Sequence, residues 1–499
     1  MKYVIGIDLG TSAVKAILVD QNGQLCGEAS RAYPLIQERE GYSEQDPSAW
    51  VEQTVNALTE LVQQFEGRPE DIEGISFSGQ MHGLVLLDAQ HQLLRNAILW
   101  NDTRTTAECE EIKDRLGPLL LDIAKNPALE GFTLPKLLWV KRHEPDLFRQ
   151  AAVFLLPKDY VRYALTGQLH MDYSDAAGTL LLDIAKKEWS DEICERVGVP
   201  KSLCPPLVES SDQIGTLSSY YATRTGLSSS VSVFAGGADN ACGAIGAGIL
   251  NDQQTMCSIG TSGVVLAYEP TALLDFKGKV HYFNHAKPGA YYTMGVTLAA
   301  GHSLSWFKDT FAPDQSFETL LAEVKDVPIG ANGLLFTPYL VGERTPYADA
   351  MVRGSFIGMD STHRLADFSR AVLEGITFSL KESLELFRAE GKVITSIVSI
   401  GGGAKNEAWL QMQADIFDAT IIKLSNEQGC ALGAAMLAAY GCGWFDSLEA
   451  CSEAFIQEAK RYEPIPENVS RYHALFALYQ QVYPATKQLS HGLSAFRRK

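Results

Sequence analysis

The stretch YVIGIDLGTSAVKAILVD, from Tyr3 to Asp20, decides the fold of this chain. Two apolar runs, residues 4–7 and 14–19, enclose a polar turn, and this pattern predicts a β-hairpin. The turn carries an acid, a glycine and two hydroxyls: Asp8, Gly10, Thr11 and Ser12. An Asn-Gly pair at residues 22–23 predicts a third antiparallel strand. A glycine-rich turn of this kind can bind a phosphate through its backbone N–H groups, although ordinary structural hairpins use it equally often.

The hairpin pattern occurs again in the second half of the 499-residue chain. The residues GTSGV at 260–264 repeat the GTSAV of residues 10–14, and they again follow an apolar run, residues 256–259. The repeat predicts two halves of similar design, residues 1–248 and 249–499, each long enough for its own core. A cleft between two phosphate loops is the expected result.

The composition restricts the kind of ligand. The net charge is −18, and no basic run is longer than residues 497–499, which argues against nucleic acids and acidic membranes as partners. No apolar run is long enough to span a membrane, and the chain begins directly with a strand. Nine scattered cysteines without a C-x-x-C pair are typical of reduced core residues, and they predict a cytoplasmic location. We therefore expect a small ligand. If it is an anion, a divalent cation and backbone N–H groups would have to neutralise it.

Three predicted strands of the first half, residues 72–77, 96–100 and 231–235, each lead into a group of polar residues. In an α/β sheet, ligands usually bind just past the ends of such strands. The candidate residues at these ends are Gln80, Met81, His82, Trp100, Asp102, Arg104, Asp239 and Asn240.

Each group has a functional and a structural explanation. An aromatic ring beside amide and charged groups, as at Trp100, is the composition of a sugar site, but a strand end with a surface salt bridge explains it equally well. A structural core histidine is the simpler explanation for His82, because no charge partner adjoins it in the sequence. Asp239 is the first carboxylate after a buried strand, which suits a general base.

Further segments predict local structure. Asp46 and Pro47 predict the start of a helix that continues with an apolar stripe. Residues 241–248 and 429–435 predict two small-residue helices, which suit either a hinge between the halves or a close-packed static core. Residues 174–179, SDAAGT, predict a polar loop to which the sequence assigns no role.

Two glycine-containing segments stand in the second half. Residues 342–346, GERTP, predict a tight polar loop. The triple glycine at 401–403 follows a predicted strand, where the bare backbone can contact a planar base or a phosphate. The loops G-x-x-x-x-G-K-[ST] and G-x-G-x-x-G are absent, so phosphate binding depends on the hairpins.

These motifs resemble those of the FGGY carbohydrate kinases, within the sugar kinase, Hsp70 and actin superfold. The resemblance covers nearly the whole chain, and it rests on IGIDLGTSAVKA, SIGTSGV, GGGAKNEAWLQMQADIF and two longer patterns at residues 131–143 and 354–374. It implies an α/β fold of two actin-like (ribonuclease H-like) ATPase domains with a central cleft and internal duplication. In the segments GYSEQDPSAW, SGQMHG, ILWNDTR, LLPKDY, SDAAGT, AGGADNACGAIG and VGERTP, the chain is most similar to members that phosphorylate D-xylulose.

The resemblance implies that MgATP is the phosphate donor and D-xylulose the acceptor, with ribulose, L-xylulose or ribitol as alternatives. Asp239 would be the catalytic base and Asp8 the magnesium ligand. The ATP-binding residues would be Gly10, Thr11, Ser12, Gly260, Thr261, Gly402, Gly403 and Asn406. The sugar-binding residues would be Gln80, Met81, His82, Trp100, Asp102, Arg104 and Asn240. Ser258 stands in the second hairpin where the first has Asp8, so the sequence predicts a single metal site. We allow for a homodimer.

The rival from another class is an ATP-driven chaperone or filament protein of the same superfold. Such a protein needs neither a set of sugar-binding residues nor a base after the strand that ends at residue 235. The sequence therefore favours the kinase.

Overall fold

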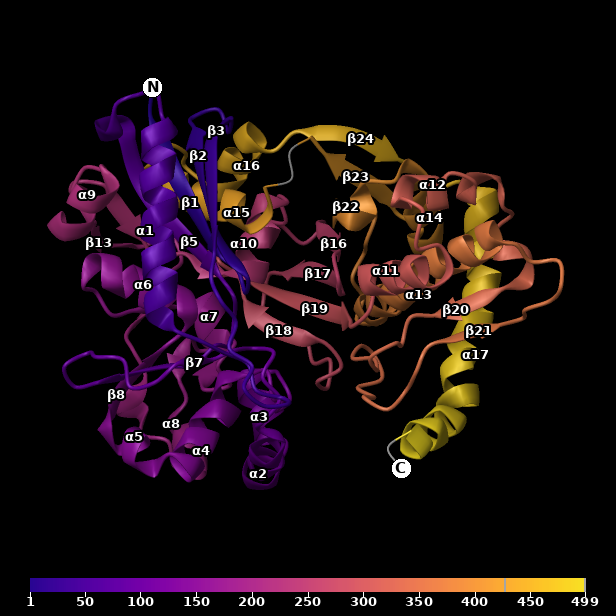
Figure 1. Ribbon diagram of the computed structural model, residues 1–499, viewed down its shortest axis with the longest axis horizontal. Coiled ribbons are helices and arrows are strands. Elements are labelled where there is room, and N and C mark those ends of the chain that lie inside the picture. The colour runs from indigo at the N-terminus through magenta and orange to yellow at the C-terminus, as the bar shows by residue number, and fades with distance from the viewer. Residues whose placement is uncertain (426–427, 498–499) are drawn as a thin grey trace.

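The computed structural model describes residues 1–425 and 428–497 and contains two halves, each built on a seven-stranded sheet (Figure 1). The first half, indigo to magenta, lies on the left of Figure 1, and most of the second half, orange to yellow, lies on the right. Arg498 and Lys499, the end of the basic run, lie outside the described residues.

The first sheet contains the predicted meander. Its three antiparallel strands are β1 (Tyr3–Leu9), β2 (Ala13–Asp20) and β3 (Leu25–Ala32). Gly23 has a φ of 77°, a left-handed value that glycine adopts without strain in the turn between β2 and β3. On its other side, β1 pairs with the parallel strand β5 (Ile72–Gly79). The sheet continues from β5 to β14 (Ser232–Phe234) and then to β13 (Gln213–Thr216), and the short strand β15 (Gly237–Ala238) also pairs with β5.

The second sheet repeats this core. Strands β16 (Thr255–Ile259) and β17 (Gly263–Glu269) form an antiparallel hairpin. β17 also pairs with the antiparallel strand β19 (Tyr291–Thr297), and β16 pairs with the parallel strand β22 (Ser396–Gly401). The outer strands are β18 (His281–Asn284), β23 (Thr420–Leu424) and β24 (Glu458–Tyr462). The predicted α/β fold with internal duplication is confirmed.

Helices cover both sheets. Helix α1 (Pro47–Gln64) begins as predicted, since Asp46 accepts a hydrogen bond from the Ser48 backbone N–H, and it packs its apolar stripe on β2 and β3. The other helices of the first half are α2 (Thr106–Leu116), α3 (Leu119–Ala124), α4 (Thr133–His143), α5 (Pro145–Gln150), α6 (Pro157–Thr166), α7 (Tyr173–Ala177), α8 (Asp191–Val197), α9 (Ser219–Thr225) and α10 (Asp239–Gly246). Those of the second half are α11 (Gly301–Phe311), α12 (Phe317–Leu321), α13 (Leu365–Ala389), α14 (Glu407–Phe417), α15 (Gly429–Gly441), α16 (Leu448–Phe455) and α17 (Pro466–Arg497). No helix in the described part of the chain has the length and apolar character needed to cross a bilayer.

The two small-residue helices, α10 and α15, pack against each other between the sheets, and α15 also contacts β1 and β5 of the first half (Figure 1). A Cβ atom on Gly433 would lie 1.8 Å from the carbonyl oxygen of Cys242, and one on Gly6 would lie 2.0 Å from that of Ala431. Only glycine fits at these contacts. Close packing is therefore confirmed, while the hinge and the domain boundary after residue 248 stay predictions.

Two local predictions need correction. The strand expected at 96–100 is reduced to β7 (Ala97–Ile98), paired with β4 (Glu44–Gln45). The polar loop expected at 174–179 contains the short buried helix α7, because the Asp172 side chain accepts a hydrogen bond from the Ser174 N–H and starts a helical turn.

Several two-stranded ribbons complete the architecture. They pair β6 (Val85–Asp88) with β8 (Ala151–Leu155), β9 (Met171–Asp172) with β12 (Leu207–Val208), β10 (Leu182–Asp183) with β11 (Glu188–Trp189), and β20 (Leu335–Thr337) with β21 (Ser355–Ile357).

Candidate active site

A cavity of about 470 Å³ lies where the two halves meet. Six of the candidate sugar-site and catalytic residues line it: Met81, His82, Trp100, Asp102, Asp239 and Asn240. The second half contributes Ser262, Val264, His281, Phe283, Met294, Val296 and Arg344. The tertiary structure thus brings together residues that are far apart in the sequence.

Asp239 is the first residue of α10 and follows directly on β15. Its Oδ1 accepts hydrogen bonds from the backbone N–H of Asn240 at 2.6 Å and from the Asn240 side-chain amide at 3.0 Å. Burial and the negative charge of Asp8 raise the pKa of Asp239 to about 7, against the effect of these two hydrogen bonds. A carboxyl group with this pKa can accept a proton near neutral pH.

Asp8 lies near the end of β1, in register with Ser78 on β5. Burial raises the pKa of Asp8, and the interaction with the Ser78 side chain and the positive charge of Lys15 oppose that rise. The Lys15 ammonium is bound elsewhere, to Gln428 and Glu28. Asp8 is therefore a poorly neutralised acid, and hard divalent cations prefer such carboxylate oxygens. The residues present fit a magnesium ion at this position.

His82 combines a structural contact with a place in the cavity wall. Its Nδ1 lies 2.7 Å from the carbonyl oxygen of Gly178. Because a carbonyl can only accept, Nδ1 carries the proton and Nε2 is left as an acceptor. Burial lowers the pKa of His82 to about 3, so the ring is neutral. The Phe132 ring packs on it with centroids 4.5 Å apart.

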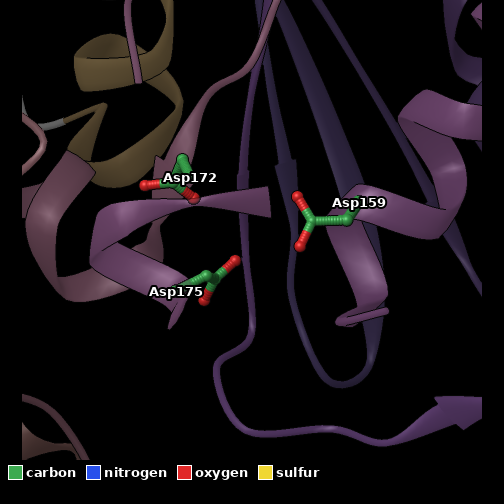
Figure 2. Close-up of side chains that lie close together, drawn as sticks. All are labelled: Asp159, Asp172 and Asp175. Carbon is green, nitrogen blue, oxygen red and sulfur yellow. The ribbon is translucent and has the colours of Figure 1, made fainter. Parts of the chain in front are cut away.

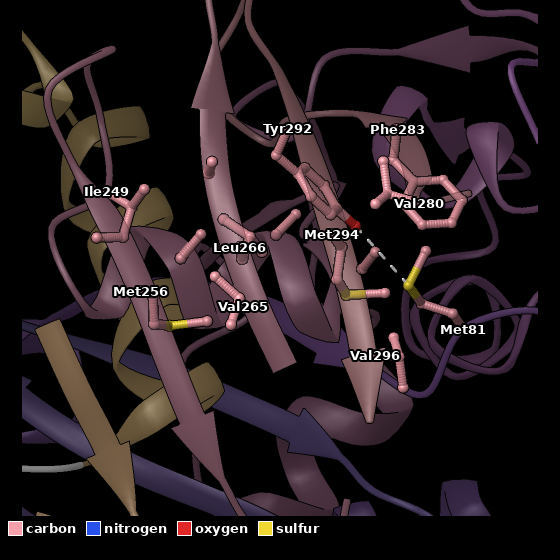
Figure 3. Packing of buried hydrophobic residues seen from close by; sticks show 14 of the residues in the cluster. Met81, Ile249, Met256, Val265, Leu266, Val280, Phe283, Tyr292, Met294 and Val296 are labelled. Atoms are coloured by element: carbon pink, nitrogen blue, oxygen red, sulfur yellow. Dashed lines mark hydrogen bonds between the residues drawn. The ribbon is translucent and has the colours of Figure 1, made fainter. Parts of the chain in front are cut away.

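Met81 forms the apolar side of the cavity together with residues of the second half. Figure 3 shows it facing β19, where the Tyr292 hydroxyl lies 4.0 Å from the Met81 sulfur and Met294 packs nearby. The Asn240 side-chain amide lies 3.6 Å from the same sulfur. Met81 therefore contacts both the segment that carries the candidate base and the second sheet.

Two candidate sugar-binding residues do not line the cavity. The Gln80 side chain is buried and donates to Gln45 at 3.3 Å. The Arg104 guanidinium binds Asp102 at 2.6 Å and Glu44 at 2.7 Å. Both side chains lie behind the wall and are bound to other protein groups, so neither is placed to touch a ligand in this cavity.

Arg344 and His281 also line the cavity, although neither was predicted from the sequence to do so. The guanidinium of Arg344 has one contact at hydrogen-bonding distance within the described residues, Nη1 to Nε2 of His281 at 3.5 Å. Its loop is fixed by the buried Glu343 carboxylate, which accepts from the Leu298 N–H at 3.0 Å. A charged residue in the predicted loop GERTP was the available signal.

A second cavity, of about 670 Å³, lies in the second half. The five predicted ATP-binding residues of this half line it: Gly260, Thr261, Gly402, Gly403 and Asn406. Asn406 caps α14 by accepting from the Trp409 N–H at 2.9 Å. Gly260 and Thr261 line this cavity, whereas the next residue, Ser262, lines the first one. A single turn therefore joins the two cavities.

The first hairpin turn, Gly10 to Ser12, lines neither cavity but adjoins the first. The indole N–H of Trp100 donates to the Thr11 hydroxyl at 2.9 Å, and the Gln45 amide donates to the Thr11 carbonyl at 2.7 Å. These contacts tie the turn to the cavity wall.

Comparison with known proteins identifies related chains. The N-terminal domain model of the FGGY family of carbohydrate kinases matches residues 3–246, and the C-terminal domain model matches residues 255–442. The xylulose kinase of Bacillus subtilis (strain 168) is 64% identical over 498 residues, which are 100% of both chains. That of Escherichia coli (strain K12) is 39% identical over 490 residues, covering 96% of this chain and 99% of the relative.

Solved structures show the same architecture. Ligand-bound xylulose kinase from Lactobacillus acidophilus has a TM-score of 0.93 at 30% identity and covers 98% of this chain and 99% of its own. Gluconate kinase from the same organism has a TM-score of 0.92, also at 30% identity, and covers 97% of this chain and 98% of its own. The fold is therefore shared by proteins named for different acceptors.

Proposed function

Because the chain belongs to the FGGY family of carbohydrate kinases, we propose that it transfers the terminal phosphate of ATP to D-xylulose, forming D-xylulose 5-phosphate. The observation that carries the proposal is the junction of the cavities at residues 260–262, with Asp239 in the wall of the smaller one. A nucleotide in the larger cavity would place its phosphates at this turn. The acceptor in the smaller cavity would then lie beside them.

Asp239 is the proposed general base. As the terminal hydroxyl oxygen of the sugar forms its bond to the γ-phosphorus, its proton passes to the Asp239 carboxylate, and the bond from phosphorus to the bridging oxygen of ADP breaks. A pKa of about 7 lets Asp239 accept this proton and release it to water after turnover. Positioning and charge neutralisation supply most of the acceleration in phosphoryl transfer.

Asp8 is the proposed ligand of Mg²⁺. When bound there, the ion would neutralise charge on the phosphate oxygens. Gly10, Thr11 and Ser12 would contribute backbone N–H groups and hydroxyls on the same side. Gly260, Thr261, Gly402, Gly403 and Asn406 would bind the nucleotide from the other side.

The sugar would lie between an apolar and a polar wall. Met81, Phe283 and Met294 can cover its C–H groups. His82, Asn240 and Arg344 can form hydrogen bonds with its oxygens. Arg104 would act by holding Asp102 in the wall, and Gln80 by its hydrogen bond to Gln45 behind the wall, rather than by touching the sugar.

A sugar acid is the second candidate acceptor. The Arg344 guanidinium faces the cavity with a single contact at hydrogen-bonding distance among the described residues, and such a group suits a carboxylate. The structural similarity to gluconate kinase points the same way. Ribulose, L-xylulose and ribitol are further alternative acceptors for the same cavity.

The test is an assay of ADP release with D-xylulose, D-ribulose, L-xylulose, ribitol, glycerol and gluconate, each compared with ATP alone. We expect D-xylulose to give the highest kcat/KM and to exceed the basal rate by orders of magnitude. A preference for another acceptor would overturn the choice of D-xylulose. A rate that no sugar raises would instead favour a chaperone or filament ATPase.

The cytoplasmic location and the homodimer are also proposals. All nine cysteines are free in the structure, which suits a reducing compartment. Light scattering of the purified protein would give its oligomeric state.

A further inference from the structure

The segment from Asp172 to Gly178 forms a buried charged cluster with Lys158 and Asp159 of α6, and the proposed mechanism does not use this cluster. Figure 2 shows the carboxylates of Asp159, Asp172 and Asp175 close together. The Lys158 ammonium lies 2.7 Å from Asp159, 2.7 Å from Asp172 and 2.9 Å from Asp175, and all four side chains are fully buried. The ammonium thus takes the place that a metal ion would need. Buried ion pairs are costly to break, so the cluster anchors this segment.

Ser174 connects the anchored segment to the candidate base. Its hydroxyl donates to the Asp172 carboxylate and accepts the backbone N–H of Ala238 at 2.9 Å. Since a carboxylate can only accept, the hydroxyl proton must point to Asp172, and the oxygen lone pair is left for Ala238. Ala238 is the residue before Asp239, and it is fully buried. The direction of this hydrogen-bond chain is therefore fixed.

Gly178 connects the same segment to the sugar cavity. Its carbonyl accepts the Nδ1–H of His82 at 2.7 Å, which sets the tautomer of the ring. His82 has a φ of 68°, a left-handed conformation that is uncommon for a residue with a side chain. A Cβ atom on Gly178 would lie 2.8 Å from His82 Nδ1. The position of the ring therefore depends on the absence of a side chain at Gly178.

We propose that the segment Asp172–Gly178 is a positioning element that sets Asp239 and His82 relative to each other, through Ser174 and Gly178 respectively. The proposal rests on the proposed roles of Asp239 as base and His82 as sugar contact. Reacting groups have to be held within about 0.5 Å of their productive geometry. A segment anchored by a buried cluster supplies that rigidity from outside the cavity.

Ser210 provides a matched control. Its hydroxyl donates to the same Asp172 oxygen as Ser174 does, at 2.8 Å, and Ser210 is also buried. This is its one side-chain hydrogen bond within the described residues. Ser210→Ala thus removes a comparable bond from the cluster without touching the link to Ala238.

The experiment compares kcat, KM and thermal unfolding for the unmodified protein, Ser174→Ala, Ser174→Cys, Gly178→Ala and Ser210→Ala. A misplacement of about 1 Å can cost about 100-fold in rate, so Ser174→Ala should lower kcat about 10- to 100-fold. Its sugar KM should stay within about twofold, and Ser174→Cys, a weaker acceptor, should be intermediate. Ser210→Ala should keep kcat and both KM values within about twofold.

Gly178→Ala should weaken binding of the sugar and leave the chemical step largely unchanged. By displacing the His82 ring, it should raise the sugar KM about tenfold, leave the KM for ATP unchanged and narrow the preference between D-xylulose and D-ribulose. Ser174→Ala should lower the rates with both sugars equally. A purely structural segment would not produce this split between kcat and KM.

Three results would each overturn the proposal. The first is a loss of kcat in Ser210→Ala as large as in Ser174→Ala, and the second is a loss of kcat across the variants that follows the melting temperature alone. The third is an unchanged sugar KM in Gly178→Ala. All variants are assayed with the sugar that the unmodified protein phosphorylates fastest, so an error in the choice of D-xylulose does not decide the outcome.

Discussion

The two hairpins share a backbone design and differ in how their turns are held. In both, the turn closes with a backbone hydrogen bond, Gly10 N–H to Ala13 and Gly260 N–H to Ser262, each of 3.0 Å. Side chains hold the first turn, where Tyr33 donates to the Gly10 carbonyl and Trp100 to Thr11. Backbone groups at the start of α11 hold the second: the Gly301 N–H donates to Gly260 at 2.8 Å, and the backbone N–H groups of Ala300 and His302 donate to Thr261.

The chemical difference is the acid. Asp8 stands in the first hairpin at the position that Ser258 occupies in the second. The first turn adjoins the smaller cavity, and the second lies between the two cavities. The two hairpins therefore share a backbone pattern, and the carboxylates of Asp8 and Asp239, the proposed metal ligand and base, both belong to the first half.

The largest expected effect tests whether the chemistry depends on the acids of the first half. Asp239→Asn keeps the shape of the side chain but cannot accept a proton, so kcat should fall about 10²- to 10⁴-fold. Calorimetry should show sugar and ATP binding close to that of the unmodified protein. Near-normal turnover in the variant would remove Asp239 as the base.

The second effect compares the hairpins directly. Asp8→Ala should lower kcat roughly 100-fold and weaken its dependence on magnesium, because the nearest carboxylate to the phosphates would be lost. Ser258→Ala is the matched change in the second hairpin and should matter little. Equal losses at saturating magnesium would contradict the asymmetric metal site.

The third effect concerns the sugar. A sugar hydroxyl in the wrong configuration leaves its hydrogen-bond partners in the protein unpaired, at a cost of about 1 to 3 kcal/mol. We expect His82 to form the hydrogen bond that distinguishes D-xylulose from D-ribulose. His82→Ala should therefore lower kcat/KM for D-xylulose more than for D-ribulose. Competition assays with both sugars would measure the ratio, and an unchanged ratio would assign the discrimination to other residues.

The smallest effect links the first hairpin to the base. The charge of Asp8 raises the pKa of Asp239, so Asp8→Asn should lower that pKa by up to about one unit. Since Asp239 must be deprotonated to act, kcat of the unmodified protein should rise with pH through about 7. The rise should occur at lower pH in Asp8→Asn. A shift to higher pH would show that the two carboxylates do not interact in this way.

Features that depend on near neighbours in the chain could be predicted from the sequence. The hairpin of residues 3–20 and the cap at Asp46 follow from turn and capping chemistry within a few residues. The internal duplication was visible because its turn sequence was kept in both halves.

Predictions for residues whose partners are distant in the sequence had to be corrected. Gln80 and Arg104 were expected to touch the sugar, but Gln45 and Glu44, distant in the sequence, engage them behind the wall. Residues 174–179 were expected to form a loop, whereas the Asp172 side chain starts helix α7 there and Lys158, from another segment, neutralises Asp172 and Asp175 in the interior.

By itself, the sequence determined the two hairpins, the family and the location of the candidate base, because short-range patterns and long matching motifs carry that information. Only the tertiary structure decided which side chains line the cavity, that Arg344 and His281 join them, and that the segment around Ser174 lies beside Asp239. The physical reason is that burial and hydrogen-bond partners are set by segments far apart in the chain. A polar residue faces the cavity only where packing leaves its donors and acceptors free.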